Sequence, residues 1–272
     1  MQKIGGDFME ISVSTGLYYT KNYKDILDVI AKTSCKNIEL MFNQGIIDIP
    51  LEDLKREIDI RDLKVLTIHT PLEFIAFPRG ESEEHWINKA MDMANAFGAK
   101  VIVTHMVMGE YFKELPFGLD ELHKENILKY KNINNICITT ENLPYITDGS
   151  FLGKEEEFID FIYNNDINVT FDTTHCAASK LDIIRTFNKI KDKVKNIHLS
   201  DFKNGEEHKI LGTGELPLKE FLENLKKEEY KGIITIELDF DNKKRNMVDT
   251  LEQASDEIEK SIELVRNIVF ED

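Results

Sequence analysis

The sequence predicts an α/β protein, a (β/α)8 TIM barrel. Eight short runs rich in apolar and β-branched residues alternate with eight stretches that show the periodicity of amphipathic helices. Most of these runs lack polar alternation, as expected for parallel strands covered by helices. The 272 residues contain no low-complexity linker, and barrels of this kind typically need roughly 250 residues. We therefore expect residues 1–272 to form a single barrel domain.

Each predicted strand is followed by a predicted helix along the whole chain. The strands are expected at Glu10–Val13, Asn37–Phe42, Val65–His69, Lys100–His105, Ile136–Glu141, Asn168–Asp172, Asn196–Leu199 and Gly232–Leu238. The helices are expected at Tyr23–Lys32, Leu51–Arg61, Glu83–Phe97, Leu119–Lys131, Lys154–Asn164, Leu181–Asp192, Leu218–Lys227 and Thr250–Asn267. An open, doubly wound sheet is the alternative, but Ser14–Tyr18 after the first strand lacks a glycine-rich phosphate loop. Eight units in one undivided domain favour closure.

Composition and charge limit the partners and the location that we expect. The net charge of −16 and the pI of about 4.9 argue weakly against a nucleic-acid partner, although an acidic protein can still carry a basic groove. No apolar run reaches the roughly 18 residues typical of a membrane-spanning helix, and the N-terminus lacks the apolar stretch of a signal peptide. Together with three separated cysteines that form no CxxC pair, these features predict a cytoplasmic protein.

The ionisable residues predict a metal site at one end of the barrel. Six predicted strands end in a side chain that can bind a metal: His69, His105, Glu141, Asp172, His198 and Glu237. In a closed barrel the carboxyl ends of the strands meet at one mouth, where catalytic groups lie. A single histidine of this kind is more often structural, but six such groups buried without partners would be strongly unfavourable. A divalent cation is the simplest partner, and three loop residues add to the same site: His175, Glu206 and His208.

Three other features are better explained by packing than by chemistry. The segment Gly212-Thr213-Gly214 has the form of a phosphate cradle, but so short a glycine pattern is more often a tight turn. Cys176 lies beside His175, yet we expect it to be a packing residue rather than a nucleophile. Trp86, in the third predicted helix, is expected to pack against the outside of the barrel.

Several motifs at the strand ends resemble those of the xylose isomerase-like barrels, from the first strand to about Asp239. The matching segments are Thr140-Glu141-Asn142, Phe171-Asp172-Thr173-Thr174-His175, His198-Leu199-Ser200-Asp201, Glu206-Glu207-His208 before Leu211-Gly212-Thr213-Gly214, and Glu237. That superfamily contains sugar and sugar-phosphate isomerases and epimerases, inosose dehydratase, and endonuclease IV-type enzymes that cleave DNA at abasic sites. The resemblance implies a metal-dependent enzyme of one of these classes.

Resemblance to the sugar epimerases implies one Mn, Mg or Co ion and a small sugar or sugar phosphate as substrate. The implied ligands are Glu141, Asp172, His198 and Glu237. Glu141 and Glu237 would form the acid/base pair on opposite faces of the substrate, transferring a proton at the carbon α to its carbonyl. The implied substrate contacts are His69, His105, His175, Lys203 and His208. Thr147 stands where some ketose epimerases have a second glutamate, which argues against a free-ketose 3-epimerase.

Resemblance to the endonuclease IV type instead implies three zinc ions bound by nine residues. These would be His69, His105, Glu141, Asp172, His175, His198, Glu206, His208 and Glu237, with Glu206 in place of that family's aspartate. The loops after His69, His105 and Glu141 depart from the endonuclease pattern. Cationic residues that could contact phosphates are few near the strand ends: Arg79, Lys203 and Lys209. The sugar class is therefore favoured, and the endonuclease remains the alternative.

Overall fold

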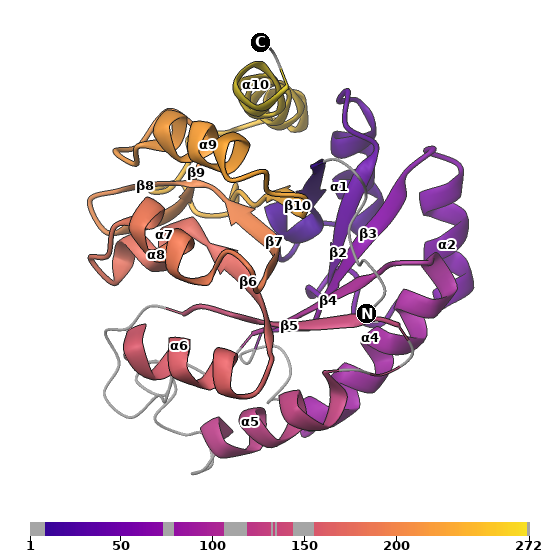
Figure 1. Cartoon of the computed structure of the whole chain (residues 1–272). Coiled ribbons are helices and arrows are strands. Elements are labelled where there is room, and N and C mark those ends of the chain that lie inside the picture. Colours follow the sequence, from indigo (N-terminus) through magenta and orange to yellow (C-terminus); the bar gives the residue numbers. More distant parts are fainter. Residues whose placement is uncertain are drawn as a thin grey trace.

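The eight apolar runs form eight parallel strands that pair edge to edge into a closed barrel (Figure 1). The computed structural model describes residues 9–72, 79–105, 119–131, 133, 135–143 and 155–270. The strands are β1 (Glu10–Ser14), β2 (Asn37–Met41), β3 (Lys64–His69), β4 (Val101–Thr104), β5 (Cys137–Glu141), β6 (Asn168–Asp172), β7 (Val194–Leu199) and β10 (Ile233–Ile236). Their order around the barrel is β1-β10-β7-β6-β5-β4-β3-β2, which confirms the predicted (β/α)8 TIM barrel.

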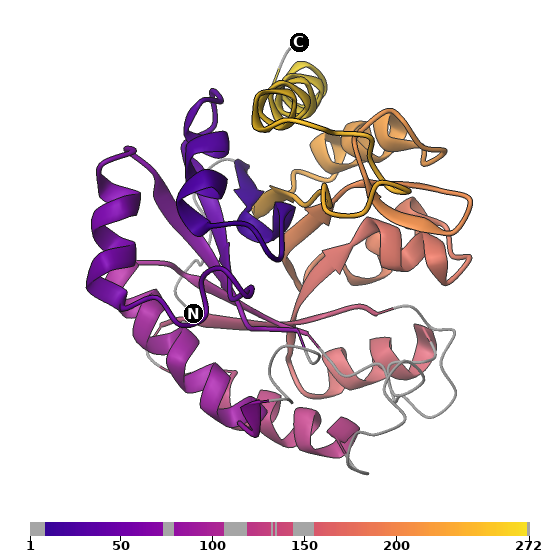
Figure 2. The same cartoon turned by 180° about the vertical axis from the view of Figure 1, so that it is seen from behind.

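Helices form the outer layer around these strands, as the view from behind also shows (Figure 2). They are α1 (Tyr23–Ala31), α2 (Leu51–Asp59), α4 (Glu83–Phe97), α5 (Leu119–Tyr130), α6 (Glu155–Asn164), α8 (Ile183–Ile190), α9 (Leu218–Lys227) and α10 (Leu251–Val269). Polar side chains mark where several begin: Ser82 accepts from the His85 N–H before α4, and Thr250 forms a capping box with Gln253 before α10. Gly98, in the left-handed conformation, ends α4.

Apolar packing closes the barrel at the end opposite the metal-binding candidates. A small buried cluster consists of Leu66, Val101, Cys137 and Ile233. Val101, Cys137 and Ile233 begin their strands. Each lies four residues before a metal-binding candidate (His105, Glu141 and Glu237), so its side chain points to the same, interior face of the barrel. The main core lies between strands and helices, and there Trp86 is buried against Phe42 with a ring distance of 5.8 Å, as predicted.

Three short elements were not predicted from the sequence. These are the 3-10 turn η1 (Thr15–Leu17), helix α7 (Thr173–Ala178) directly after β6, and the antiparallel hairpin of β8 (Asp201–Lys203) and β9 (Glu206–Lys209). They are too short to show a periodic pattern. The remaining described boundaries agree with the predicted ones or differ by at most two residues. Lys154, the predicted start of one helix, and Thr147, noted for the epimerase comparison, lie outside the described residues.

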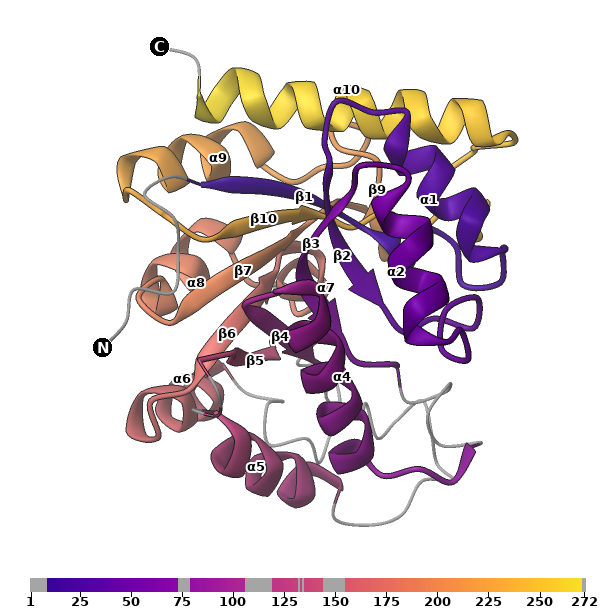
Figure 3. The ribbon, with the colours of Figure 1, turned by 90° about the vertical axis from the view of Figure 1, so that its right-hand side faces the viewer.

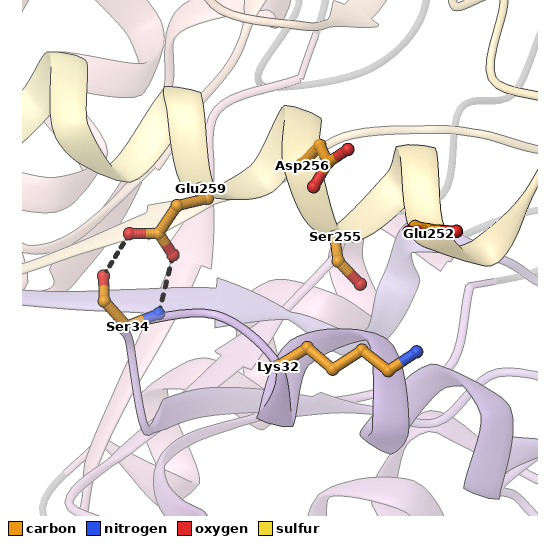
Figure 4. Close-up of a pocket in the computed structure, with 6 residues that line it drawn as sticks. All are labelled: Lys32, Ser34, Glu252, Ser255, Asp256 and Glu259. Carbon is orange, nitrogen blue, oxygen red and sulfur yellow. Dashed lines mark hydrogen bonds between the residues drawn. The ribbon is translucent and has the colours of Figure 1, made fainter.

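The last helix completes the outer layer by packing against α9 and α1 (Figure 3). Ser34, in the loop after α1, donates its backbone N–H and its hydroxyl to the Glu259 carboxylate of α10. Beside this contact lies a surface hollow lined by Lys32, Ser34, Glu252, Ser255, Asp256 and Glu259 (Figure 4). In the part of the chain that the structure describes, no helix is long and apolar enough to span a membrane.

Candidate metal centre

The polar ends of the strands bring four residues together at the mouth of the barrel. Glu141 ends β5, Asp172 ends β6, His198 is the penultimate residue of β7, and Glu237 directly follows β10. One potential ligand atom from each lies within 4.8 Å of the others. All four side chains are buried, and Asp172 and His198 are fully inaccessible. Parallel pairing aligns Asp172 with His198, so the register itself places ligands from neighbouring strands side by side.

Three atoms of this group lack hydrogen-bond partners among the described residues. In the Asp172 carboxylate, only one of the two oxygens has a hydrogen-bond partner. Oδ1 accepts from the His175 N–H at 2.7 Å and from the Thr174 hydroxyl at 2.9 Å, and so caps α7. Oδ2 is buried without a partner, as are Nδ1 of His198 and Oε2 of Glu237.

These unpartnered atoms face one another. Nδ1 of His198 lies 3.0 Å from Oε2 of Glu237 and 4.0 Å from Oδ2 of Asp172. Leaving buried polar atoms unpaired is costly, so such a cluster needs a further partner. Carboxylate oxygens and an imidazole nitrogen are common ligands of divalent cations. The four residues therefore fit a divalent metal ion.

Charge interactions with histidines dominate the environment of Glu141. Its Oε1 lies 3.1 Å from Nδ1 of His175 and 3.3 Å from Nδ1 of His198, and its Oε2 lies 3.4 Å from Nε2 of His69. Burial alone would raise the pKa of Glu141, but charge on His198 and the proximity of all three histidines hold that pKa well below its usual range. Glu141 is therefore an ionised carboxylate.

Burial and neighbouring charges also shift the pKa values of the other three residues. Burial opposes ionisation of Glu237, but the neighbouring His198 outweighs it and lowers the pKa of Glu237. Burial also disfavours charge on His198, yet the carboxylates of Glu237, Glu39 and Glu141 raise its pKa well above the usual value. For Asp172, burial together with Glu141 and Glu237 raises the pKa. Three carboxyl groups are thus crowded around one histidine, and a cation would reduce the repulsion between them.

Four further histidines lie around this centre. His69 and His198 stack with ring centroids 5.6 Å apart, and His105 lies 5.9 Å from the ring of His175. Three additional groups have potential ligand atoms within 4.8 Å of one another: His69, His198 and Glu237; His105, Glu141 and His175; Asp172, His175 and His208. The structure therefore brings eight of the nine metal-competent residues to one mouth.

Glu206 and Lys203 are placed differently from the rest. Glu206 belongs to none of the candidate metal groups within the described ranges, and its carboxylate lies 3.9 Å from Nε of Arg245. Lys203, on the same hairpin, has its ammonium 3.9 Å from Glu215. The hairpin thus directs these two side chains toward charged neighbours rather than into the clustered ligands.

The structure adds residues that were missed in the sequence. Glu39 is fully buried on β2, with Oε2 3.2 Å from Nε2 of His198. Asn142 holds the backbone of Asp172 through two hydrogen bonds, of 2.7 and 3.0 Å. Burial, together with the charges of Glu237 and Asp239, raises the pKa of Tyr19. A charged residue inside the apolar run Asn37–Phe42 was the available signal for Glu39.

The Gly212-Thr213-Gly214 segment and Cys176 have structural roles. Both glycine amides donate to Oδ2 of Asp201, at 3.0 and 2.8 Å, so they are engaged within the chain and the segment forms a turn. Cys176 is fully buried, and burial raises the pKa of its thiol to about 12. A protonated, buried thiol is a poor nucleophile, in agreement with the packing role expected for it.

The carboxylates and histidines cluster at the carboxyl-terminal mouth of a closed parallel barrel, which is where TIM-barrel enzymes have their active sites. Residues 27–268 match the family described as the xylose isomerase-like TIM barrel. The chain belongs to this family, which confirms the resemblance seen in the motifs.

Individual relatives are more distant. The chain is 24% identical over 234 residues to inosose dehydratase of Clostridium perfringens (strain 13 / Type A), covering 70% of this chain and 74% of that protein. It is 25% identical over 224 residues to inosose dehydratase of Lacticaseibacillus casei, covering 71% and 75%. Among solved structures it is similar in fold to D-allulose 3-epimerase from Methylomonas sp. in complex with D-allulose, with a TM-score of 0.74, 15% identity and coverage of 97% and 98%. It also resembles an AP endonuclease, family 2, from Brucella melitensis, with a TM-score of 0.68, 15% identity and coverage of 84% and 92%.

Proposed function

We propose that this protein is a divalent-metal-dependent isomerase or epimerase of small sugars or sugar phosphates. The reaction is proton transfer at the carbon α to a carbonyl. The observation that carries the proposal is the cluster of three buried, unpartnered atoms, on Asp172, His198 and Glu237, beside the ionised Glu141. These four residues would hold a Mn, Mg, Co or Zn ion. A divalent cation bound there would polarise the carbonyl and hydroxyl oxygens of the substrate and offset developing negative charge.

The acid/base pair in this proposal is Glu141 and Glu237. They come from opposite sides of His198, whose Nδ1 lies 3.3 Å from one carboxylate and 3.0 Å from the other. One carboxylate removes the α proton, and the electron pair of the broken C–H bond moves onto the carbonyl oxygen. The other group, protonated from solvent, returns its proton to the opposite face of the same carbon. For an isomerisation the proton goes instead to the neighbouring carbon, while the hydroxyl proton on that carbon's oxygen passes to the former carbonyl oxygen. The low pKa of both groups supports the carboxylate form that a base requires.

The surrounding histidines would contact the hydroxyl groups of the substrate. His69, His105, His175 and His208 all border the four-residue group. The names of the similar proteins support this substrate class, because inosose dehydratase and D-allulose 3-epimerase both act on polyhydroxylated ketones. Loss of water next to a carbonyl and inversion next to a carbonyl share a first step, which is removal of the α proton. The relatives therefore support the proton transfer more strongly than they support any one product.

Deuterium exchange tests the proposal directly. Candidate ketoses, ketose phosphates and cyclic polyhydroxy ketones are incubated in heavy water with Mn²⁺-loaded protein, and mass spectrometry measures deuterium at the α carbon. We expect exchange with the wild type, and a loss of about 10²–10⁴-fold in Glu141→Gln and Glu237→Gln, because the amide cannot act as a base. Glu206→Gln is the matched control, since Glu206 lies outside the clustered ligands, and it should retain exchange. Absence of exchange with every such compound would contradict the proposal.

A zinc-dependent, endonuclease IV-type activity on abasic DNA is the second candidate. It is favoured by one observation: the mouth gathers more metal-competent residues than a single ion can use. Against it, the cationic residues expected to contact DNA are already engaged. Arg79 pairs with Asp48 at 2.6 Å, Lys203 lies 3.9 Å from Glu215, and the Lys209 ammonium donates to a backbone carbonyl.

Metal content distinguishes the two candidates. Elemental analysis of protein purified without chelator should give about one Mn, Mg or Co per chain for the sugar enzyme, and two or three zinc ions for the endonuclease. In the second case Glu206 would be a ligand, so Glu206→Gln should lower metal-dependent nicking of abasic DNA. In the first case the same variant should leave α-proton exchange unchanged.

A further inference from the structure

A polar layer lies inside the barrel directly below the candidate metal centre, and Glu39 is its central residue. Barrel interiors are usually filled by branched apolar side chains. Here the fully buried carboxylate of Glu39 accepts, on Oε2, from the Thr67 hydroxyl at 2.9 Å and from the Asn196 amide at 3.2 Å. The same oxygen lies 3.2 Å from Nε2 of His198. A buried carboxylate is costly, so its partners indicate a specific role.

The direction of the hydrogen bonds in this layer is determined by its own donors. The Thr235 hydroxyl donates to Oδ1 of Asn196 at 2.8 Å, which leaves the Asn196 amide hydrogens for Glu39. Because the Thr235 proton is used in this way, Ser12 must donate to the Thr235 oxygen, 3.3 Å away. The donors therefore follow one another from Ser12 through Thr235 and Asn196 to Oε2 of Glu39. This order polarises the chain of bonds toward the carboxylate.

An acceptor at this position determines which nitrogen of His198 carries hydrogen. Oε2 of Glu39 already accepts from Thr67 and Asn196, so Nε2 of His198 is the donor to the same oxygen. As a metal ligand the imidazole is neutral and has one N–H, so the lone pair is then on Nδ1. Nδ1 is the atom that faces the carboxylates of Glu141 at 3.3 Å and Glu237 at 3.0 Å. The lone pair is thus directed into the metal centre.

The stacked neighbour, His69, is oriented by a different kind of partner. Its Nδ1 lies 2.6 Å from the backbone carbonyl of Thr70 and donates to it, and its Nε2 lies 3.4 Å from Oε2 of Glu141. A neutral carbonyl orients the ring of His69, whereas a carboxylate orients the ring of His198. His198 therefore gains basicity from the charged acceptor at its Nε2.

We propose that Glu39 is a positioning residue that holds His198 in the Nε2-protonated form and so presents Nδ1 to a divalent cation. The inference rests on the proposed metal-dependent function and adds a residue to it. Glu39 acts through His198 and not on the substrate. Partners of this kind typically contribute 10–100-fold to metal affinity, so removal of the Glu39 acceptor should weaken Mn²⁺ binding by about that factor.

The test compares Mn²⁺ affinity, measured by isothermal titration of metal-free protein, across a graded series. Glu39→Leu removes the acceptor and should weaken binding about 10–100-fold. Glu39→Gln keeps an acceptor oxygen without the charge and should recover part of that loss. Ser12→Ala is the control, because it alters the same buried layer without contacting Glu39 or His198. Equal affinity in Glu39→Leu and the wild type would overturn the inference.

A measurement on the wild type avoids any dependence on variants that fold poorly. Long-range ¹H–¹⁵N spectra of the Zn²⁺-loaded protein report which ring nitrogen of each histidine carries hydrogen, with His198 assigned from the His198→Gln spectrum. We expect hydrogen on Nε2 of His198, and hydrogen on Nδ1 would refute the inference. If the wild type binds neither Mn²⁺ nor Zn²⁺, the proposed metal centre and this inference both fail. If the ions bind as expected but no ketone exchanges its α proton, only the proposed reaction fails.

Discussion

Asp172 offers a substitution that separates folding from metal binding within one side chain. Asp172→Asn keeps the oxygen that caps α7, because the His175 N–H and the Thr174 hydroxyl both require an acceptor there. The amide group then replaces Oδ2, the oxygen that is buried without a partner. The variant should therefore fold normally and lose one metal ligand.

The expected magnitude follows from binding to the native state. A cation at 100 times its Kd stabilises the wild type by about 2.7 kcal/mol. Unfolding entropy of about 2.1 cal/mol/K per residue converts this into a rise in melting temperature of about 5 °C for a chain of this size. Asp172→Asn should show little rise at the same Mn²⁺ concentration. Without metal it should melt at or above the chelated wild type, because burial and the carboxylates of Glu141 and Glu237 raise the pKa of Asp172 and disfavour its charge.

Thermal melts with chelator and with Mn²⁺ provide the assay, and Asp172→Ala is the matched comparison. The alanine variant loses the cap as well, at a cost of about 0.5–2 kcal/mol. It should therefore melt lower than Asp172→Asn even without metal. An undiminished Mn²⁺-dependent rise in Asp172→Asn would refute the assignment of Oδ2 as a ligand. Equal melting of the two metal-free variants would refute the capping argument.

Three further predictions concern the turn, the thiols and the pH dependence of metal binding. Gly214→Ala should destabilise the fold by about 1–3 kcal/mol in urea unfolding, because its Cβ would lie 2.2 Å from Oδ1 of Asp201; a change near zero would contradict this geometry. The native protein should react slowly with Ellman's reagent at pH 8 and rapidly once unfolded. The reason is that all three cysteines are buried, and burial raises the thiol pKa of Cys35 and raises those of Cys137 and Cys176 to about 12. Fast reaction of the native protein would show that at least one of these thiols is accessible and ionised. Mn²⁺ affinity should rise with pH, and binding should release protons. Burial disfavours charge on His175 and His198, but neighbouring carboxylates outweigh burial and raise both pKa values well above 6.5. In the metal-free protein these rings are therefore protonated at neutral pH. In the metal-free protein, the ion pairs of these protonated rings stabilise the fold fully below the unfolded pKa of about 6.5, and that stability is lost as pH rises through the folded pKa. A Mn²⁺ affinity that does not change with pH would contradict the protonation of these rings.

The sequence by itself determined the barrel and the position of most candidate ligands along it. Short apolar runs and amphipathic stretches report local burial, which depends on residues close together in the chain. Parallel strands of one barrel necessarily end at the same mouth, so the ends of the runs indicated six ligands before any contact was known: His69, His105, Glu141, Asp172, His198 and Glu237. This reasoning did not require knowledge of which strands pair or how far they are shifted.

Only the tertiary structure decided how individual atoms are used. Glu39 and His198 are separated by 159 positions, and they meet because barrel closure leaves only β1 and β10 between β2 and β7. Asp172 uses one oxygen as a helix cap and leaves the other for the metal centre, whereas Glu206 lies near Arg245 outside the cluster. Hydrogen bonds and ion pairs depend on the register between strands and on the direction of each side chain in space. Local sequence patterns contain neither quantity, so these contacts were set by the closure of the barrel.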